Sequence, residues 1–594
     1  MKYTLPLILF VLAPLVSLAE KPNIVLVITD DQGYGDLAHN GNPHVKTPAI
    51  DKLHSESVAL DDYHVAPTCS PTRCGLLTGH WTNRTGVWHT VNGRSMLREN
   101  EITIATLLKN NGYTTGLFGK WHLGDNYPYR PEDRGFDEVF RHGGGGVGQT
   151  PDLWNNNYFG GSYFHNGKIV DAEGFCTDVF FDQGIDFIRK SAEAKKPFFA
   201  YISTNAPHGP LHCPPKYMEM YKGMDKKYQA FYGMITNIDD NVARTRKVLE
   251  ELGIADNTIF IFTTDNGTAY GQGIYNAGMK GSKGSAYEGG HRVPFIIRWP
   301  AGGLHSKKSV KTLTGFVDVV PTLLDLCGAD KIPAALKFDG VSIRKLLYEA
   351  DSAEWPDRFL ITDSQRVRDP IKWKDSSVMS ERWRLINGKE LYEIDDDPGQ
   401  KNNVATQHPE QVETMRKFYE SWWTELEPTF SQTTEIYLGD DKAPKVTLTG
   451  HDWIQEQLPP WNQGMIRVGN DGNKGKKHEG YWAVKVVKSG SYKLELRRWP
   501  SEADAPITAS LPAKPNVPGA SKAFSNNKGK AFPFTKATLR IDGKDVATKD
   551  IDKDATHVTF TVDLTEGSHQ LAPVFKTANG NETGAYYLIV SSAP

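Results

Sequence analysis

Residues 23–31 read NIVLVITDD, an unbroken apolar and β-branched run that stops at two aspartates. A strand buried on both faces of a parallel sheet has this character, because helices cover both of its sides. Asp30 and Asp31 would then lie at the carboxyl end of the strand, the edge at which open α/β sheets bind ligands. The stretch therefore predicts an α/β fold with a candidate ligand site at the end of this strand.

Three further apolar runs deliver polar residues in the same way: residues 113–119 before Lys120 and His122, residues 197–204 before His208, and residues 258–264 before Asp265 and Asn266. Helix-like segments separate these runs, which favours a mostly parallel sheet flanked by helices. Aspartate and asparagine also cap helices and open turns after strands, so one such pair alone would favour that structural role. Because polar residues follow all four runs, we favour one shared site over four separate structural roles.

The first nineteen residues have the pattern of an export signal. Lys2 supplies the positive start, residues 5–16 the apolar stretch, and residues 17–19 a small-x-small motif, so we expect cleavage after Ala19. The apolar stretch is shorter than the roughly 20 residues of a spanning helix, and no later segment is apolar enough to span. The pattern predicts a secreted or periplasmic protein without a membrane span.

Changes of pattern predict three domains in the rest of the chain. Residues 20–330 carry the α/β pattern, and residues 331–428 predict a smaller α+β subdomain with a strand-like piece at residues 384–394 and a helix from Pro409 to Leu426. From residue 429 to 594 short strand-like runs alternate with Gly-, Pro- and Asn-rich breaks, which predicts a β-sandwich. We expect its core to hold most of these aromatic residues, while any exposed ones would stack on carbohydrate: Trp453, Trp461, Tyr481, Trp482 and Trp499.

The net charge argues against two kinds of partner, and the number of cysteines indicates that at least one of them is unusual. The net charge of −3 over 594 residues is nearly neutral, so nothing indicates a nucleic acid or an anionic membrane as partner, and anions must be bound by local clusters. Five cysteines are an odd number for an oxidising compartment. At least one of them is therefore unpaired or chemically special.

The sharpest local pattern is Cys69-Ser70-Pro71-Thr72-Arg73, continued by Leu77-Thr78-Gly79. Here the chain resembles the formylglycine-dependent (type I) sulfatase family, the arylsulfatase-like branch of the alkaline-phosphatase-like superfamily. The resemblance runs over roughly residues 21–426. Taken alone, the pentapeptide is equally typical of a buried cysteine before a helix with proline in its first turn. The other motifs of the family decide between the two interpretations.

The resemblance implies a modified nucleophile at Cys69. A formylglycine-generating maturation enzyme would oxidise this cysteine to formylglycine (3-oxoalanine), whose aldehyde hydrates to a geminal diol. One diol oxygen can attack sulfur and displace the alcohol, and the second can then reform the aldehyde and expel sulfate by breaking a carbon–oxygen bond. A plain thiol cannot complete this cycle.

The resemblance also implies a metal site. Asp30 and Asp31 match the family's first ligand pair, Asp265 and Asn266 match the second, and the modified Cys69 completes the set. All of these donors are oxygens, which predicts a hard cation: Ca²⁺, with Mg²⁺ as the alternative. Such an ion would neutralise sulfate oxygens and lower the pKa of the diol.

Cations and histidines complete the site that the resemblance implies. Lys120, in KWHLG, matches a sulfate-binding lysine, and Lys283, before Tyr-Glu-Gly-Gly, matches a second one; Lys280 is a lower-ranked rival. Arg73 would orient the diol and the ion. The remaining two roles fall to histidines, since His122 matches the base that assists collapse of the diol and His208 the group near the leaving oxygen, where a general acid protonates the departing alcohol.

Two residues depart from the family pattern, because Thr72 stands where serine is common and His80 where arginine is common. The run Gly143 to Gly148 formally fits G-x-G-x-x-G, but it follows no clear strand and opens no long helix, so we expect a mobile loop rather than a dinucleotide site. Residues 154–165 are expected either to line the substrate pocket or to pack as a surface loop.

The sequence thus predicts a sulfatase that hydrolyses sulfate monoesters, most plausibly on a sulfated carbohydrate. A phosphonate or phosphate ester hydrolase of the same fold is the enzymatic alternative. A non-catalytic glycan-binding protein is the alternative from another class, and the full set of metal ligands and cations argues against it.

Overall fold

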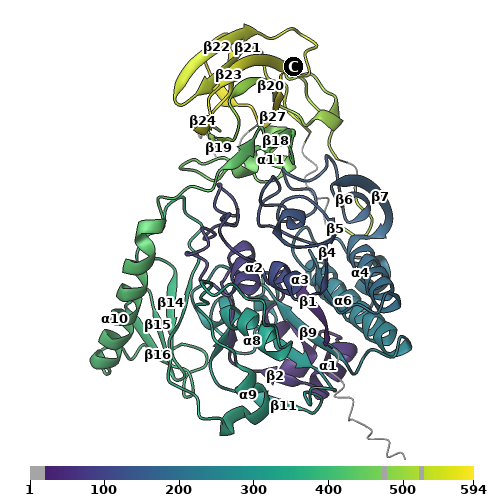
Figure 1. Cartoon of the computed structure of the whole chain (residues 1–594), viewed down its shortest axis with the longest axis vertical. Helices are drawn as coiled ribbons and strands as arrows, with labels where there is room; N and C mark the ends of the chain where they lie inside the picture. Colours follow the sequence, from purple (N-terminus) through teal and green to yellow (C-terminus); the bar gives the residue numbers. More distant parts are fainter. Residues whose placement is uncertain (1–20, 470–477, 515, 521–527, 594) are drawn as a thin grey trace, which may run out of the picture.

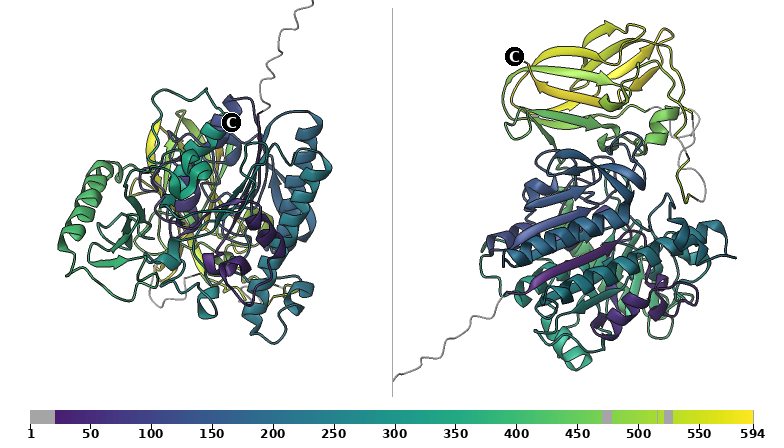
Figure 2. Two further views of the ribbon diagram at one scale, coloured as in Figure 1. Left: turned by 90° about the horizontal axis from the view of Figure 1, so that it is seen from below. Right: turned by 90° about the vertical axis from the view of Figure 1, so that its right-hand side faces the viewer.

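A computed structural model of the chain describes residues 21–469, 478–514, 516–520 and 528–593. Figure 1 shows an α/β body, a smaller sheet with helix α10 on one side of it, and a β-sheet region at one end; Figure 2 shows the same arrangement from two other directions. The predicted export signal, residues 1–19, lies outside the described residues. Within the described part, no helix has both the length and the apolar character that crossing a membrane requires.

A ten-stranded sheet forms the body, in the order β11-β2-β10-β9-β1-β8-β4-β5-β6-β7. Its five central strands, β9 to β5 in this order, are parallel, while β10 and the β6–β7 hairpin join antiparallel. The predicted α/β fold is confirmed, with antiparallel strands towards the two edges. The strands are β1 (Asn23–Thr29), β2 (Val58–Leu60), β4 (Thr114–Gly119), β5 (Glu138–Arg141), β6 (Phe159–His165), β7 (Lys168–Phe175), β8 (Phe198–Ser203), β9 (Thr258–Thr264), β10 (Phe295–Arg298) and β11 (Lys308–Val310).

Strand β1 shows why this sheet needs helices on both faces. Ile24, Leu26 and Ile28 pack into a core with α2, α3 and α8, whereas Val25 and Val27 pack into a second core with α1, α4 and α6. Each fully buried aliphatic side chain stabilises the fold by about 1.5–3 kcal/mol. The helices of the body are α1 (Pro48–Ser55), α2 (Cys69–Thr78), α3 (Ile104–Asn110), α4 (Cys176–Glu193), α5 (Pro215–Glu219), α6 (Lys226–Glu251), α7 (Glu288–His291), α8 (Val319–Leu326) and α9 (Arg344–Glu349).

Two stretches of the body differ from the sequence-based expectations. Residues 154–165 are not a surface loop throughout, because they contain β6, which pairs with β5 and β7. β3 (Tyr63–His64), which lies just before α2 in the chain, forms a two-stranded sheet with β12 (Thr314–Gly315). β6 pairs with neighbouring segments of the chain, whereas β3 pairs with β12, which lies far along the chain.

A second, four-stranded antiparallel sheet packs against α10 (Pro409–Leu426), the helix predicted from Pro409. The predicted strand at residues 384–394 is wrong as a single strand, since the chain reverses at Asn387 and Gly388, both with positive φ. An Asn-Gly pair is the preferred two-residue hairpin turn, and that is the signal that the prediction overlooked. The strands are β13 (Leu360–Asp363), β14 (Ser376–Met379), β15 (Trp383–Ile386) and β16 (Glu390–Glu393).

Two further sheets pack together after residue 435. One contains β17 (Ile436–Leu438), β19 (Trp482–Val486), β24 (Gly567–Leu571), β21 (Phe534–Ile541), β25 (Val574–Thr577) and β26 (Glu582–Gly584), with β22 (Lys544–Asp550) beside β21. The other contains β18 (Lys445–Thr449), β27 (Tyr587–Ser592), β20 (Gly490–Arg497) and β23 (Val558–Leu564), and α11 (Gln463–Val468) follows β18. Trp453, Trp482 and Trp499 are buried in the shared core. The domain boundaries at residues 330 and 428 stay predictions.

Candidate active site

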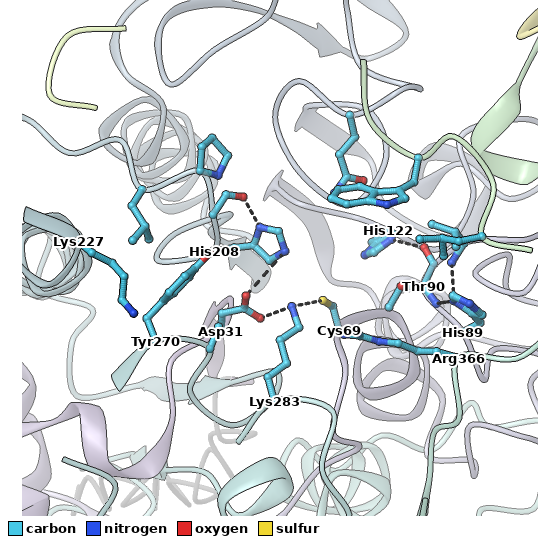
Figure 3. Close-up of a pocket in the computed structure, with 18 of the residues that line it drawn as sticks. Asp31, Cys69, His89, Thr90, His122, His208, Lys227, Tyr270, Lys283 and Arg366 are labelled. Carbon is cyan, nitrogen blue, oxygen red and sulfur yellow. Dashed lines mark hydrogen bonds and ion pairs between the residues drawn. The ribbon is translucent and has the colours of Figure 1, made fainter. Parts of the chain in front are cut away.

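The polar residues predicted at four strand ends converge because their strands are neighbours. Strands β9, β1, β8 and β4 lie side by side and parallel, so their carboxyl ends meet at one edge of the sheet. Figure 3 shows Asp31 from β1 and His208 from the loop after β8 beside Cys69 and Lys283. Asp31 and His122 both have left-handed backbone, with φ of 69° and 62°. Such strained positions cluster at functional sites.

Helix α2 positions Cys69 and Arg73, which lie one turn apart at its N-terminal end. Every residue of α2 is buried, and positions four apart lie on the same helical face. Arg73 donates from Nε and Nη2 to Asp265 Oδ2, at 3.0 and 2.7 Å, and from Nη1 to Ser203 at the end of β8. Burial raises the pKa of the Cys69 thiol, although Lys120 and Lys283 act in the opposite direction. The encoded cysteine is therefore a neutral thiol rather than a reactive thiolate.

Two lysines lie against the aspartates. Lys120 Nζ is 2.7 Å from Asp30 Oδ2, and both side chains are fully buried. Lys283 Nζ is 2.5 Å from Asp31 Oδ1 and 3.6 Å from Cys69 Sγ. Although burial opposes its charge, the Asp31 carboxylate raises the pKa of Lys283 above its usual range. Lys283 is therefore charged beside the thiol.

The structure separates Lys283 from its rival Lys280. Backbone hydrogen bonds to other segments fix the loop that carries Lys283. Lys283 N donates to Thr268 O, and Gly284 N donates to Pro67 O, which lies just before α2. Lys280 Nζ instead lies 3.8 Å from the centre of the Tyr287 ring and 5.1 Å from that of Tyr392. Lys283, as predicted, is the lysine beside position 69.

The acidic residues fit a hard cation. Ligand atoms of Asp30, Cys69 and Asp265 lie within 4.8 Å of one another. The buried atoms Asp30 Oδ1 and Asn266 Oδ1 have no hydrogen-bond partner in the described structure. Burial and the neighbouring Asp30 carboxylate raise the pKa of Asp265 to about 6. Unpaired buried oxygens and crowded carboxylates are the environment that a calcium or magnesium ion stabilises.

The two histidines face the same space in different ways. His122 lies beside a carbonyl, with Nε2 2.8 Å from Thr90 O, and its buried Nδ1 has no partner among the described groups. The Nε2 atom therefore carries the proton and Nδ1 is an acceptor. His208 contacts Gly209 O through Nδ1, and its Nε2 is 3.7 Å from Asp31 Oδ2. Burial lowers the pKa of His208 to about 4, although Asp31 acts in the opposite direction.

The glycine run Gly143 to Gly148 supports His122 and is not a dinucleotide site. A Cβ at Gly145 would come within 2.2 Å of the His122 ring. The loop is tied down by hydrogen bonds, among them Gly145 N to Gln149 Oε1 and Gly148 N to Asp152 Oδ2, at 2.9 and 2.7 Å. The glycines therefore allow close approach to the histidine.

A second group with metal-ligand spacing among the described residues is an ion-pair network. It consists of His64, Glu288 and His291. Arg384 Nε donates to Glu288 Oε1 at 2.7 Å, and its Nη2 donates to both oxygens of Asp62 at 2.9 Å. The arginine already neutralises the carboxylates, so this group has a structural role.

A cavity of about 860 Å³ opens above Cys69, Lys283, His122 and His208. Its outer wall contains residues that the sequence analysis did not place in the site: His89, Thr90, Val91, Gln149, Leu211, Tyr270, Arg366, Leu458 and Trp461. Trp461 comes from the C-terminal region and Arg366 follows β13. No motif marks either residue, since only the packing of distant segments brings them to the cavity.

All five cysteines are buried and none forms a disulfide. Cys74 lies one turn after Pro71 in α2 and Cys327 follows α8, and both thiols lie in the apolar core and do not line the cavity. Of the five, Cys69 lines the cavity, and its proposed modification stays a prediction.

Comparisons with known proteins agree with this arrangement. Residues 22–329 match the profile described as Sulfatase, and residues 282–425 match N-sulphoglucosamine sulphohydrolase, C-terminal. Arylsulfatase G of Mus musculus is 30% identical over 383 residues, which cover 56% of this chain and 69% of that protein. N-acetylgalactosamine-6-sulfatase of Rattus norvegicus is 29% identical over 422 residues, which cover 66% of this chain and 78% of that protein.

Solved structures give the same result. The chain resembles Ps i-CgsB in complex with k-i-k-neocarrahexaose with a TM-score of 0.61 and 28% identity, over 68% of this chain and 92% of that one. It resembles the PsFucS1 sulfatase from Pseudoalteromonas sp. in fold, with a TM-score of 0.57 over 70% of this chain and 92% of that one. The Sulfatase profile, residues 22–329, covers more than half of the chain. The chain belongs to the sulfatase family.

Proposed function

We propose that this protein hydrolyses sulfate monoesters of carbohydrates, with formylglycine at position 69 and a bound Ca²⁺ ion, Mg²⁺ being the alternative. The observation that carries the proposal is the position of Cys69, at the N-terminus of α2, with Lys283 Nζ 3.6 Å from its sulfur. Membership of the sulfatase family makes the reaction a sulfuric ester hydrolysis. The modified residue, the ion and the sugar are our proposals.

The encoded thiol supports the need for modification. Burial keeps Cys69 protonated, so the unmodified residue is a poor nucleophile. Formylglycine, as its hydrate, supplies an oxygen nucleophile, and the ion supplies positive charge for the sulfate oxygens. Asp30, Asp31, Asp265 and Asn266 would hold the ion, since their oxygens surround the site and two of them lack partners.

The positive groups of the chain fit the charge of a sulfate ester. Lys120 and Lys283 would bind sulfate oxygens, and Arg73, fixed on Asp265, would orient the nucleophile. The N-terminus of α2 adds a positive helix dipole at position 69. Fixed charges in a buried site stabilise the transition state because they need not reorient during the reaction.

The two histidines can serve two different proton-transfer steps. His122 presents the unpartnered Nδ1 acceptor, which suits the base that removes a proton from the oxygen at position 69. His208 lies at the cavity floor, where its Nε2 would have to carry a proton to serve the leaving alcohol, and the neighbouring Asp31 carboxylate favours the protonated ring against the effect of burial. Burial lowers the pKa of both imidazoles, which suits His122 as the base, whereas the acid role of His208 requires its imidazolium form.

The carbohydrate assignment rests on the relatives and on the cavity. Among the relatives are proteins named for N-acetylgalactosamine 6-sulfate, and a similar structure contains an oligosaccharide. The cavity is large enough for a ligand of more than one ring. Export, which residues 1–19 predict, would place the enzyme with extracellular polysaccharides.

The test compares the mature enzyme with a Cys69→Ala variant. Protein co-produced with a maturation enzyme should carry formylglycine by intact-mass analysis and release sulfate from 4-nitrophenyl sulfate. The alanine variant should lose more than roughly a thousandfold in kcat. Aryl phosphonate and aryl phosphate are measured in parallel. Faster turnover of either would favour the phosphonate or phosphate hydrolase, and equal activity of both variants would exclude a catalytic role for position 69.

A further inference from the structure

We infer that residues 451–463 build a second sugar-binding subsite beside the sulfate site, in which Trp461 stacks on the neighbouring sugar ring and Arg366 binds a negative group on it. This inference rests on the proposed function and deepens it, since it assigns the substrate class. The substrate would be an anionic oligosaccharide rather than a sulfated monosaccharide. The C-terminal region would then be part of the active site.

Trp461 differs from the other tryptophans of this region. Trp453, Trp482 and Trp499 have at most 1% of their surface exposed and fill the sandwich core. Trp461 is partly exposed and lines the cavity that contains Cys69 and Lys283. Leu458, which is 45% exposed, lines the same wall. An indole and an exposed leucine beside a catalytic cavity suit the apolar face of a sugar ring.

The backbone of this segment is docked on the glycine-rich loop of the α/β body. Thr150 N donates to Trp461 O at 3.0 Å, and Thr150 Oγ1 donates to Pro460 O at 2.6 Å. Gln463 Nε2 donates to the carbonyl oxygens of Gln149, Asp152 and Leu153, at 3.1, 3.1 and 3.0 Å. Trp461 is thus held in place before a ligand arrives, which lowers the entropy cost of binding.

The opposite end of the segment is docked on the loop that supports His122. Asn92 Nδ2 donates to Gln455 O at 3.1 Å, and Gln455 N donates back to Asn92 Oδ1 at 2.9 Å. Asn92 N also donates to His451 O. Two residues earlier, the carbonyl of Thr90 contacts His122. The segment therefore joins the support of a predicted catalytic residue to the outer wall of the cavity.

Arg366 provides the charged part of the subsite. It is exposed, has left-handed backbone with φ of 48°, and lines the cavity. Among the described residues no carboxylate pairs with it, although the next arginine, Arg368, pairs with Glu456. Figure 3 shows Arg366 with His89 and Thr90 on one side of Cys69, and Lys227 with Tyr270 on the other. An unpaired guanidinium on this wall suits a second sulfate or a carboxylate.

Kinetics of single variants test the subsite. Trp461→Ala should lower kcat/KM for the best of a panel of size-defined chondroitin sulfate, heparin and carrageenan oligosaccharides by about tenfold or more. It should change kcat/KM for 4-nitrophenyl sulfate, which has no second ring, by less than about twofold. Trp461→Phe should recover most of the loss. Arg366→Gln should weaken turnover only of oligosaccharides that carry a second anionic group.

Trp373→Ala is the matched control, since Trp373 is also partly exposed but stacks on Tyr419, away from the cavity. It should leave the ratio between the two kinds of substrate unchanged. Equal losses on both substrates for Trp461→Ala, or no loss on any oligosaccharide, would overturn the subsite. A preference of the wild type for sulfated monosaccharides would do the same.

Calorimetry separates this inference from the proposed function. The Cys69→Ala variant keeps the whole outer wall, so it should bind the oligosaccharide without turning it over. The double variant Cys69→Ala/Trp461→Ala should bind it about tenfold or more weakly. Binding without turnover by the mature wild type would refute the proposed reaction but retain the subsite. Equal binding by the single and double variants would refute the subsite alone.

Discussion

The charge of Arg384 balances two buried carboxylates. Its side chain is fully buried on β15 and contacts Glu288 of α7 and Asp62, which precedes β3. It thus links the small sheet to the segment that leads to Cys69. Arg384→Met would leave Asp62 and Glu288 as unpaired buried charges, at a cost of about 3–5 kcal/mol in the free energy of unfolding.

Urea titration monitored by tryptophan fluorescence checks this prediction. Arg382→Met is the control, because Arg382 lies on the neighbouring part of the chain and pairs with Glu393 while its side chain is 56% exposed. It should change the free energy of unfolding by less than about 1 kcal/mol. Equal destabilisation by the two variants would show that burial of the ion pair is not the cause.

The unpaired oxygens of Asp30 and Asn266 predict that Ca²⁺ stabilises the fold. An ion that binds only the folded protein adds about 2.7 kcal/mol at a hundred times its Kd. Adding Ca²⁺ to EGTA-treated protein should therefore raise the Tm, and Asp30→Asn should remove most of the rise. Asp182→Asn, which changes an exposed carboxylate, should keep it. An identical rise in all three proteins would place the bound ion elsewhere.

At the scale of elements, a buried carboxyl joins β13 to α10. Asp363 at the end of β13 accepts hydrogen bonds from Tyr419 of α10 and from Gln365, at 2.7 and 2.6 Å. Burial raises its pKa from 3.8 to about 7, although these hydrogen bonds act in the opposite direction. The folded protein thus binds this proton more tightly than the unfolded chain does.

The sign of the resulting pH dependence follows. The contribution of Asp363 to stability is fully present below its unfolded pKa of 3.8 and is lost as the pH rises through about 7. Asp363→Asn has no carboxyl proton to lose. The free energy of unfolding of this variant should therefore rise relative to that of the wild type as the pH increases from 3.8 to about 7. Denaturant titrations at several pH values measure the difference, with the exposed Asp325→Asn as control. Parallel pH profiles of wild type and Asp363→Asn would contradict the prediction.

At the scale of the whole molecule, the C-terminal sheets are integrated with the body. Met96 and Tyr129 of the body belong to the same apolar cluster as Trp482 and Leu494 of the sandwich. The segment at residues 451–463 adds polar contacts around the cavity. Figure 1 shows this contact region between the two parts. We therefore expect the two parts to unfold together.

Scanning calorimetry of the full chain should show a single transition. Gln463→Ala would remove the amide donor that the carbonyl oxygens of Gln149, Asp152 and Leu153 share, at a cost of about 1–3 kcal/mol, and should lower the Tm or split the transition. Gln457→Ala, in the same segment, should have little effect. Two separate transitions in the wild type would mean that the interface is too weak to couple the parts.

Short local motifs in the sequence identify the site residues, and the fold brings these motifs together. Most of these residues lie in short motifs at the ends of strands or in the first turns of α2, so chain direction and strand order bring them together, whereas Lys283 lies on a loop that is hydrogen-bonded to Pro67 just before α2. The Asn387-Gly388 hairpin was also local and could have been found from its turn chemistry. Trp461 and Arg366 could not, because nothing near them in sequence shows which distant surface they face.

The sequence by itself determined the α/β fold, the family motifs and the residues around Cys69, because hydrophobic runs and strand-end polar residues act over a few positions. The motif favoured Lys283 over Lys280, but only the tertiary structure placed Lys283 against Cys69 and decided which tryptophan of the C-terminal region faces the cavity. Those outcomes depend on contacts between segments hundreds of residues apart, such as Thr150 with Trp461. Such contacts are set by the packing of whole sheets, which no short stretch of sequence specifies.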